Sequence, residues 1–518
     1  MNIDALLIYP KLGSMDSMVM DLPLSIIYAA AHSVKRGYNI KAVDLRTEWD
    51  NREEILRNHL EQGVRLAGVS VMTGAPLYYS REISRFIKTN YPDTKIVWGG
   101  PHPTILPETI TENYIDFLVR GYGSVSLAKL IEQVREDKRD FAEIEGLSYK
   151  RNGDAVHNQR SPEFEMLHYT ELPYHLINVD SPCYARSYMG KKMFPIFTTI
   201  GCPYRCSFCV HPTIYKVING KKWLPHPDEE IVEHIEYIVE RFGVDHICFI
   251  DDTSFPDLKR MRRIFNLILE RGIKISLEFR GARVNEIDRM DDDFLDLMVK
   301  AGGQVLMVGV ESASDRILKI MQKGIKGKEQ ILRINQKLAR HPELIPHYNF
   351  IYGTPGETYE DLVETKEVVL QMLRDNPQAY FGFGSDWKPI PGTKMLEIAE
   401  TDYGFKSPQT FDDWIEIDSS DAKSKIVHPW YTKKHNNLIK LMQIASFVVD
   451  DKIIKESSSN NTNFFKILRI LSRLYKPVAL FRLKYNFHHL LIEYELWRLM
   501  VKIMPYLQVK RENKRTSS

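Results

Sequence analysis

The stretch Thr199-Ile-Gly-Cys-Pro-Tyr-Arg-Cys-Ser-Phe-Cys-Val210 carries three of the chain's five cysteines. Their CxxxCxxC spacing places three thiolates on one short loop. A [4Fe-4S] cluster takes four ligands, so three cysteines leave one iron open to another molecule. An open coordination position is typical of metal sites that perform chemistry. The stretch therefore predicts that Cys202, Cys206 and Cys209 hold a catalytic iron–sulfur cluster.

Zinc is the main alternative, with His211 as a fourth ligand two residues after Cys209. Zinc motifs usually pair Cys-x2-Cys with a second, distant pair, and this chain has no such pair. Disulfides are not favoured because three cysteines within eight residues cannot pair evenly, and the others are Cys183 and Cys248. The spacing favours a cluster over zinc or a structural role.

The length of 518 residues predicts about three domains. Hydrophobic residues make up 43% of the chain and charged residues 27%, as in ordinary globular proteins. A net charge of +2 argues against nucleic-acid binding by composition. No apolar run approaches the roughly 18 residues of a membrane span, and the amino terminus does not resemble a signal peptide. With few cysteines and an oxygen-sensitive cluster, these features predict a cytoplasmic protein.

Strand and helix patterns alternate over residues 1–140. We expect apolar strands at 5–9, 39–45, 66–72, 95–98 and 117–120, and helices at 22–35 and 78–89. Buried strands alternating with amphipathic helices predict a doubly wound, Rossmann-like parallel sheet. Ligands bind such sheets at the carboxyl ends of the strands. The loops there are Ser70–Gly74, Gly99–His102 and Arg120–Gly123.

Residues 141–185 are expected to form a connector, in which Asn152-Gly153 predicts a hairpin. Strand–helix alternation resumes over residues 186–400. Six strands are expected at 194–199, 246–250, 275–280, 304–310, 347–352 and 381–387. Six βα units over about 200 residues fit a partial barrel better than a closed eight-unit one.

The cysteine stretch resembles that of the radical S-adenosylmethionine (SAM) superfamily, in which SAM chelates the open iron. The resemblance implies that the reduced cluster cleaves SAM into methionine and a 5′-deoxyadenosyl radical. It also implies that Asp251 and Asp252, after the second strand, meet the amino group of SAM, and carboxylates suit an ammonium. Arg283, after the third strand, is implied to hold the SAM carboxylate with its planar fork of donors.

Two later motifs extend the resemblance. Glu311 and Ser312, after the fourth strand, are implied to bond the ribose hydroxyls of SAM. Gly353 and Gly356, after the fifth strand, resemble the glycine-rich segment that flanks adenine. Individual residues of these motifs could instead cap helices without contacting SAM, because Asp, Ser and Thr are common capping residues. The correct order of these motifs after the cysteines makes the resemblance strong.

The loops of the first domain resemble the cobalamin-binding domain found upstream of many radical SAM cores. By this resemblance, Ser70, Thr73, Gly99 and Gly100 surround the nucleotide tail and the corrin edge. Glycines let the backbone approach a large flat ligand, although Gly-Gly also has a plain reading as a turn. The family includes methylases of unactivated carbon and the anaerobic magnesium-protoporphyrin monomethyl ester cyclase.

Two departures from that family concern cobalamin. Members that ligate cobalt from below use Asp-x-His-x-x-Gly after the first strand, whereas residues 9–18 contain no histidine. His32 and His102 lie elsewhere, so we expect cobalamin with a displaced base and no lower histidine ligand. Tyr122 and Ser124 replace carboxylates that relatives often carry. A vestigial first domain that binds no cobalamin is therefore the alternative.

Residues 401–518 form a helical, basic pattern interrupted by a polar run at 456–462. Residues 466–515 hold twelve Lys or Arg against three Glu. The interleaved apolar residues are Leu468, Leu471, Leu474, Leu480, Phe481, Phe487, Leu490, Leu491 and Trp497. A basic amphipathic helix can lie on an anionic membrane. A helix packed over the barrel mouth with a solvated basic face is the favoured alternative.

These features predict a radical SAM enzyme that uses cobalamin to functionalise an unactivated carbon of a small molecule, for which a lipid or a tetrapyrrole would suit. Methyl transfer is the first expectation, with methylcobalamin as donor. Radical cyclisation or rearrangement, with or without cobalamin, is the alternative. Flavodoxin or ferredoxin is the expected electron donor, and no nucleic-acid partner is expected. A non-enzymatic cobalamin or iron–sulfur sensor is a further alternative, against which the ordered SAM motifs argue. The sequence names neither the substrate nor the oligomeric state.

Overall fold

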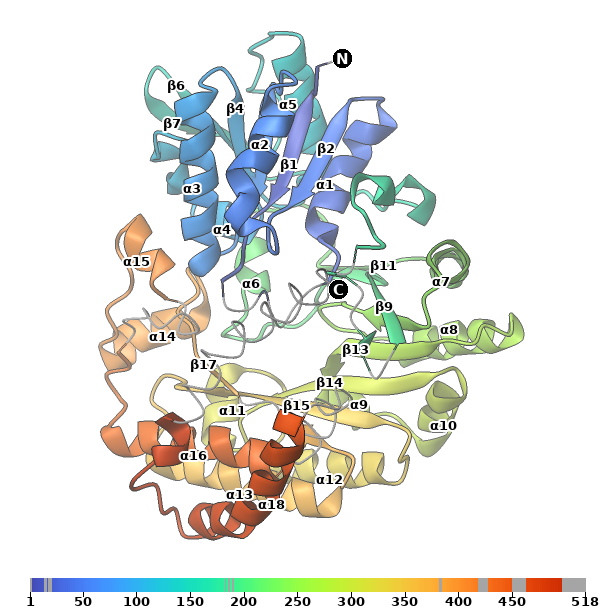
Figure 1. Ribbon diagram of the computed structural model, residues 1–518, viewed down its shortest axis with the longest axis vertical. Helices are drawn as coiled ribbons and strands as arrows, with labels where there is room; N and C mark the ends of the chain where they lie inside the picture. Colours follow the sequence, from blue (N-terminus) through green and yellow to red (C-terminus); the bar gives the residue numbers. More distant parts are fainter. Residues whose placement is uncertain are drawn as a thin grey trace.

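The first sheet lies at the top of Figure 1 and is built from apolar parallel strands. In the computed structural model these strands are β1 (Ala5–Tyr9), β2 (Ile40–Asp44), β3 (Leu66–Ser70), β4 (Lys95–Gly99) and β5 (Phe117–Val119). The helices between them are α1 (Leu24–Lys35), α2 (Arg52–Leu60), α3 (Ala75–Asn90), α4 (Pro101–Ile105) and α5 (Ser124–Arg135). The strand order β2-β1-β3-β4-β5 confirms the predicted doubly wound sheet.

The structure describes residues 2–13, 16, 21–181, 183–184, 187–188, 191–381, 384–417, 427–449 and 463–495. Among these, the side chains at 187–188, 444–448 and 463–469 are not described. The predicted polar run at 456–462, Trp497 and the side chain of Leu468 therefore lie outside the described part of the chain. The same is true of several residues in the 9–18 stretch, and of residues 496–518.

Alternate residues of the first sheet face two different cores, because successive strand side chains point to opposite faces. Leu7 of β1 packs in the core that contains α1 and α5. Leu6 and Ile8 pack in a second core with α2 and α3. Helices on both faces explain why the strands are apolar throughout.

The predicted hairpin belongs to the first sheet. Its strands β6 (Leu147–Arg151) and β7 (Asp154–His157) are antiparallel, and β6 also pairs antiparallel with β5. Asn152 and Gly153 have φ of 55° and 92°, as a two-residue hairpin turn requires. The hairpin extends the first sheet to seven strands, so this part of the expected connector completes the sheet instead of bridging two domains.

The second sheet forms the predicted partial barrel. Its parallel strands are β9 (Lys191–Ile196), β12 (His246–Phe249), β13 (Ser276–Arg283), β14 (Gly303–Glu311), β15 (Ile345–Tyr352) and the short β16 (Tyr380–Phe381) and β17 (Ser385–Asp386). The short β8 (Ser187–Tyr188) adds an antiparallel edge. The helices are α7 (Asp228–Phe242), α8 (Leu258–Glu270), α9 (Val284–Ile287), α10 (Asp292–Lys300), α11 (Asp315–Met321), α12 (Lys328–Ala339) and α13 (Tyr359–Asp375). Figure 1 shows this unit below the first sheet.

Two predicted strands are interrupted in the structure. The strand expected at 194–199 ends at Ile196, and Thr199 begins β10 (Thr199–Gly201), which pairs antiparallel with β11 (Trp223–Pro225). The strand expected at 381–387 is divided between β16 and β17. The short helix α6 (His211–Ile214) lies between β10 and β11 in the chain. Short 3₁₀ turns are η2 (Trp49–Asn51), η3 (Pro107–Thr111), η4 (Tyr169–Glu171) and η5 (Tyr174–Leu176).

The carboxyl-terminal helices lie along the side and outer wall of the barrel (Figure 1). They are α14 (Lys394–Tyr403), α15 (Phe411–Ile415), α16 (Lys433–Val449) and α18 (Asn463–Lys484). α15 contacts α3 of the first domain, α16 packs against α13, and α18 packs against α16. The expectation that this basic helix covers the barrel mouth is wrong for α18, because its neighbours are outer helices.

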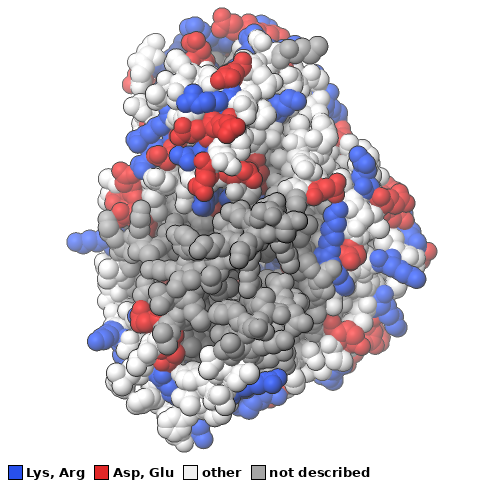
Figure 2. Space-filling view, viewed as in Figure 1, with Lys and Arg blue, Asp and Glu red and all other residues white. Residues whose placement is uncertain are grey.

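Two further observations concern the helices and the charged surface. In the described part of the chain, no helix combines the length and the apolar character that crossing a bilayer requires. On the face of the first domain seen in Figure 2, basic and acidic side chains are interspersed.

Phe279 of β13 should be the most sensitive single position in the barrel core. Its fully buried ring lies 5.1 Å from that of Phe249 and 5.0 Å from that of Phe255. Phe279→Ala should lower the apparent free energy of unfolding by about 3–5 kcal/mol, because it leaves a cavity. Denaturant titration followed by circular dichroism measures this. Leu269→Ala, at a side chain 40% exposed on α8, is the control and should cost under about 1 kcal/mol. Equal effects of the two variants would contradict the assigned core.

Candidate functional site

The cysteine loop (residues 202–222) is closed at its base by the pairing of β10 with β11. Gly201 has a φ of 79°, and a Cβ there would lie 2.3 Å from the carbonyl oxygen of Lys222, so only glycine fits this close approach. The Tyr215 hydroxyl accepts from the Cys202 amide at 2.6 Å and donates to the Cys202 carbonyl at 3.0 Å. The first cysteine is therefore held at a fixed position.

The three cysteines are free thiols, with Cys202 and Cys206 buried and Cys209 half-buried. Burial raises the pKa of Cys202 to about 12 and that of Cys209 to about 11. Since metal ligands must be deprotonated, cluster binding would release these protons. Among the described residues, no three His, Cys, Asp or Glu side chains converge as a single metal ion would need. His211, the fourth ligand of the zinc alternative, has its Nε2 2.9 Å from Asp252.

Arg283 at the end of β13 reaches the cysteine loop. Its Nη1 lies 3.4 Å from the Cys206 sulfur, and its guanidinium lies 3.8 Å from the centre of the Tyr204 ring. Nη2 donates to the carbonyl of Lys323 at 2.5 Å. The structure thus places a fixed positive charge beside the second cysteine, at the end of the barrel where the sequence predicts SAM.

The paired aspartates after β12 have different surroundings. Asp251 is buried, and its carboxylate accepts from the Thr198 amide, the Thr198 hydroxyl and the Thr199 amide at 2.6–2.9 Å. Burial raises the pKa of Asp251 to about 6, although these hydrogen bonds lower it. Asp251 therefore fixes the turn that leads into the cysteine loop, whereas the sequence predicted a SAM contact. Asp252 is partly exposed and pairs with His211 inside the loop.

Glu311 ends β14 in a left-handed conformation, with a φ of 68°. Such backbone strain in a non-glycine residue is concentrated at functional sites. The Glu311 carboxylate pairs with Lys323 Nζ at 2.5 Å. A Cβ on Gly309 would lie 2.5 Å from Glu311 Oε1 and 2.6 Å from Lys323 Nζ, so glycine makes room for this ion pair. The predicted ribose ligand is thus close to the barrel end that carries Arg283, whose Nη2 bonds the Lys323 carbonyl.

Ser312, the second predicted ribose contact, is bonded within the fold. Its side chain is buried and accepts from the amide of Ser314 at 3.2 Å, and its oxygen lies 3.4 Å from the Thr365 hydroxyl of α13. The hydroxyl is therefore used within the fold, where it caps the turn before α11.

The predicted adenine segment is covered by the carboxyl-terminal region. A Cβ on Gly353 would lie 2.9 Å from the imidazole of His428, and one on Gly356 would lie 2.2 Å from the Tyr403 ring. Both glycines have positive φ, 75° and 72°. The Gly353 amide donates to Glu357 at 2.7 Å, and the Tyr431 hydroxyl bonds the same carboxylate at 2.5 Å. Residues far apart in sequence therefore pack this segment closely.

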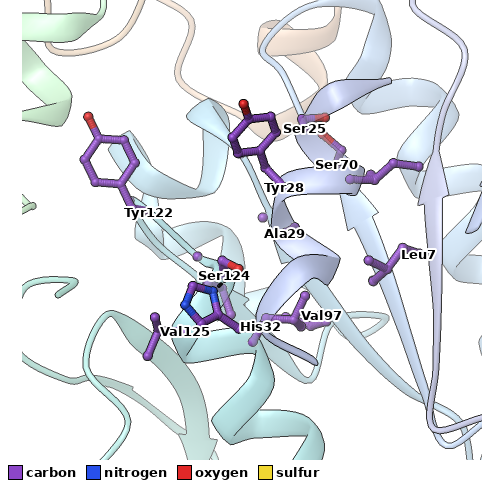
Figure 3. Close-up of a pocket in the computed structure, with 18 of the residues that line it drawn as sticks. Leu7, Ser25, Tyr28, Ala29, His32, Ser70, Val97, Tyr122, Ser124 and Val125 are labelled. Atoms are coloured by element: carbon purple, nitrogen blue, oxygen red, sulfur yellow. Dashed lines mark hydrogen bonds between the residues drawn. The ribbon is translucent and has the colours of Figure 1, made fainter. Parts of the chain in front are cut away.

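A cavity of about 270 Å³ lies at the carboxyl edge of the first sheet (Figure 3). Ser70, Gly99 and Gly100 line it, as the sequence predicts, and the Ser25 hydroxyl lies 3.3 Å from that of Ser70. Its volume is just below the usual range of ligand pockets, so it fits one part of a large ligand. Thr73, the fourth predicted residue, follows Ser70 by three positions in the chain. Its hydroxyl lies 3.0 Å from His102 Nδ1.

The same cavity has a wall that the sequence did not assign. Ser25, Tyr28 and His32 of α1 line it together with Ser124 of α5. His32 Nδ1 lies 2.8 Å from the Ser124 hydroxyl, and Nε2 lies 3.0 Å from Glu165. Figure 3 shows the His32 ring beside Ser124. Ser25, Tyr28 and His32 are three and then four residues apart, a spacing that places side chains on one face of a helix. This spacing is the sequence signal that could have identified the wall.

The cysteine loop is attached to the first domain. The Ser161 amide donates to the Val217 carbonyl at 3.1 Å, and the Asn219 amide donates to the Ser161 carbonyl at 3.2 Å. Helix α4, which follows Gly99-Gly100, contacts α6 within the cysteine loop. The glycine loop of the first sheet and the cysteines of the barrel are therefore neighbours across the domain interface.

A polar network also joins the two units. Asp21, in the chain between β1 and α1, pairs with Arg280 of β13, and Arg280 Nε donates to Glu278 at 2.9 Å. His246 Nε2 lies 3.3 Å from Glu278. Burial alone would raise the pKa of Glu278, but His246 and Arg280 lower it to about 2. The barrel interior therefore carries a hydrogen-bonded chain of charged and polar groups that reaches the first domain.

Two protein-family models match the chain, one for each sheet. The model described as B12 binding domain matches residues 16–131, and the model described as Radical SAM superfamily matches residues 196–369. These ranges contain the cavity-lining loops of the first sheet and the cysteine loop with four barrel strands.

Similar proteins cover most of the chain. An uncharacterized methyltransferase of Pyrococcus horikoshii is 26% identical over 457 residues, which are 88% of this chain and 94% of that protein. The anaerobic magnesium-protoporphyrin IX monomethyl ester cyclase of Synechocystis sp. is 24% identical over 407 residues, 77% of this chain and 79% of the cyclase. The solved structure of the cobalamin-dependent SAM radical enzyme OxsB matches with a TM-score of 0.69 at 17% identity, over 97% of this chain and 75% of OxsB. This last likeness shows the fold.

Asp21 and Arg280 should be energetically coupled, because their ion pair joins the two units in a mostly buried setting. Asp21→Asn, Arg280→Gln and the double variant form a thermodynamic cycle. We expect a coupling of about 1–3 kcal/mol by denaturant titration. The more exposed pair of Arg333 with Asp288 is the control and should give under about 1 kcal/mol. Effects of Asp21→Asn and Arg280→Gln that add to within about 0.5 kcal/mol would contradict the link.

Glu357 should make stability depend on pH. Burial raises its pKa from 4.5 to about 8. Between these values the folded state keeps the proton that the unfolded state has lost, so stability falls as pH rises, by at most about 1.4 kcal/mol per unit. Glu357→Gln should flatten this part of the profile, measured by denaturation between pH 5 and 8. The exposed Glu343→Gln serves as the control. A Glu357→Gln profile as steep as that of the unmodified protein would refute the assignment.

Proposed function

Because the chain belongs to the radical SAM enzymes with a B12-binding domain, we propose that it transfers a methyl group from cobalamin to an unactivated carbon of a small molecule. The observation that carries this proposal is the attachment of the cysteine loop to the first domain, through Ser161 and through the contact of α4 with α6. Methyl transfer needs both cofactors within reach of one substrate carbon, and this attachment supports two sites that face one interface.

The cysteine loop fits a [4Fe-4S] cluster. It offers three free thiols, two of them buried, and the guanidinium of Arg283 is 3.4 Å from the Cys206 sulfur. Donors beside the sulfur ligands tune such clusters, and the positive charge offsets that of the thiolates. Cys202, Cys206 and Cys209 would hold the cluster, with one iron left for SAM.

The cavity of the first domain fits the tail of cobalamin. Gly68, Gly99 and Gly100 present backbone without side chains to it, and a Cβ on Gly68 would lie 2.8 Å from Leu7. His32 Nδ1 lies 2.8 Å from the Ser124 hydroxyl, and Nε2 lies 3.0 Å from a Glu165 oxygen without an aligned hydrogen bond. Burial lowers the pKa of His102 to about 3, and its Nδ1 bonds Thr73. These contacts support cobalamin binding without a lower histidine ligand.

The barrel residues would orient SAM. Asp252 and Arg283 lie at the cysteine loop and carry the charges that complement the ammonium and carboxylate of an amino acid. Glu311, held by Lys323, is the proposed acceptor for ribose hydroxyls. When bound, the reduced cluster with SAM supplies a 5′-deoxyadenosyl radical, and methylcobalamin supplies the methyl group.

Radical cyclisation is the second candidate, favoured by the similarity to the Synechocystis sp. cyclase. A flavodoxin or ferredoxin electron donor, a lipid or tetrapyrrole substrate and a cytoplasmic location are also proposals, as is the lack of a nucleic-acid partner. The net charge of +2 supports the last of these.

The products of SAM distinguish these functions. The anaerobically reconstituted protein, supplied with SAM, hydroxocobalamin and a reductant that converts it to cob(I)alamin, should form both 5′-deoxyadenosine and S-adenosylhomocysteine. Cys206→Ala should lose the cluster absorbance and lower deoxyadenosine formation by about a hundredfold or more, since it removes a ligand. Cys183→Ala, outside the loop, is the control. Deoxyadenosine without S-adenosylhomocysteine would favour cyclisation, and neither product would favour a sensor. Normal deoxyadenosine formation by Cys206→Ala would reject the cluster assignment.

A further inference from the structure

Helix α18 turns large apolar side chains toward solvent. Ile470, Leu474, Val478, Phe481 and Tyr485 are exposed, with Leu474 at 71%, Ile470 at 58% and Phe481 at 56%. Their spacing of four, four, three and four residues places them on one face of the helix and the residue after it. We call these five residues the apolar stripe. An exposed apolar surface of this kind marks an interaction site.

The opposite face of α18 is packed and anchored. Ser472, Ala479 and Leu483 are buried. The buried Lys366 of α13 donates to the carbonyl of Leu483 at 2.7 Å and to the side chain of Asn486 at 2.6 Å. The orientation of the stripe is therefore set by attachment to the outer wall of the barrel, where α18 lies beside α16 (Figure 1).

The charged residues along α18 have one sign. Residues 463–492 contain six Lys or Arg and no Asp or Glu. Arg473 and Lys484 are exposed on the same helix, whereas Arg482 is turned inward to Glu493. On a helical projection, Arg473 and Lys484 fall beside one edge of the stripe. The surface thus combines apolar side chains with flanking cations.

We propose that α18 binds in the plane of an anionic lipid bilayer. Apolar side chains with basic neighbours are the arrangement of in-plane membrane helices, whose apolar face enters the boundary between headgroups and acyl chains. Lys and Arg add attraction to anionic headgroups. Because no described helix can cross a bilayer, the contact is peripheral. This inference is independent of the SAM chemistry.

Charge decides between a membrane and a second copy of the chain. A symmetric dimer through α18 would bring the basic surfaces of the two copies together, and like charges oppose such contact. An anionic bilayer instead neutralises them. The stripe also occupies a single face of one helix, so its side chains can enter a flat membrane surface together.

Vesicle flotation tests the proposal with the full chain. Vesicles with about one-third phosphatidylglycerol should bind the protein more strongly than pure phosphatidylcholine, and salt should weaken the binding. Leu474→Glu with Phe481→Glu should lower the bound fraction about tenfold or more, without unfolding, since both side chains are exposed. Leu269→Glu, at an exposed position of α8, is the matched control and should bind as the unmodified protein does.

The cationic contribution is tested separately. Arg473→Glu with Lys484→Glu should reduce binding to the level seen with pure phosphatidylcholine, because it removes the attraction to anionic lipid while keeping the stripe. Lack of binding by the unmodified protein to phosphatidylglycerol vesicles would overturn the proposal. So would a dimer in light scattering that Leu474→Glu with Phe481→Glu converts to a monomer, since the stripe would then be a protein interface.

Discussion

The attachment of the cysteine loop to the first domain is the contact on which the rest of the structure depends. Ser161 pairs on both sides with residues 217–219, and a Cβ on Gly121 would collide with Ser161 and Ile218. The loop is therefore held by the connector at Ser161 and by the first domain at Gly121. Parallel sheets bind ligands at the carboxyl ends of their strands. This contact therefore brings the ligand-binding edge of the first sheet close to that of the barrel, although the two sheets share no strand.

Charge reinforces the same interface from inside the barrel. Arg280 lies between Asp21 of the first domain and Glu278 of its own strand, and Glu278 is also bonded to His246. Buried ions are stable only when their partners complete their hydrogen bonds. The network therefore favours one relative placement of the two units, whereas apolar packing alone tolerates small shifts.

Sequence reasoning predicted the sheets and the cysteine loop because apolar periodicity and short-range spacing encode them. It could not assign Asp251 or Ser312, since a carboxylate or hydroxyl after a strand has the same pattern whether it caps a turn or binds a ligand. The cover over Gly353 comes from His428, about 75 residues later, and no local pattern encodes such a contact. The sequence also could not predict which face of α18 is exposed, because an apolar stripe alone does not indicate which side of a helix is packed.

The most direct test of the two-cofactor interface is the EPR spectrum of cob(II)alamin bound to the anaerobically reconstituted protein. His32 Nδ1 lies beside the Ser124 hydroxyl, His102 Nδ1 lies beside the Thr73 hydroxyl, and residues 9–18 contain no histidine. The predicted spectrum is therefore that of bound cob(II)alamin without nitrogen superhyperfine splitting. Nitrogen splitting would reveal an axial ligand that the structure does not provide. Failure to bind cobalamin would contradict the assignment of the first domain.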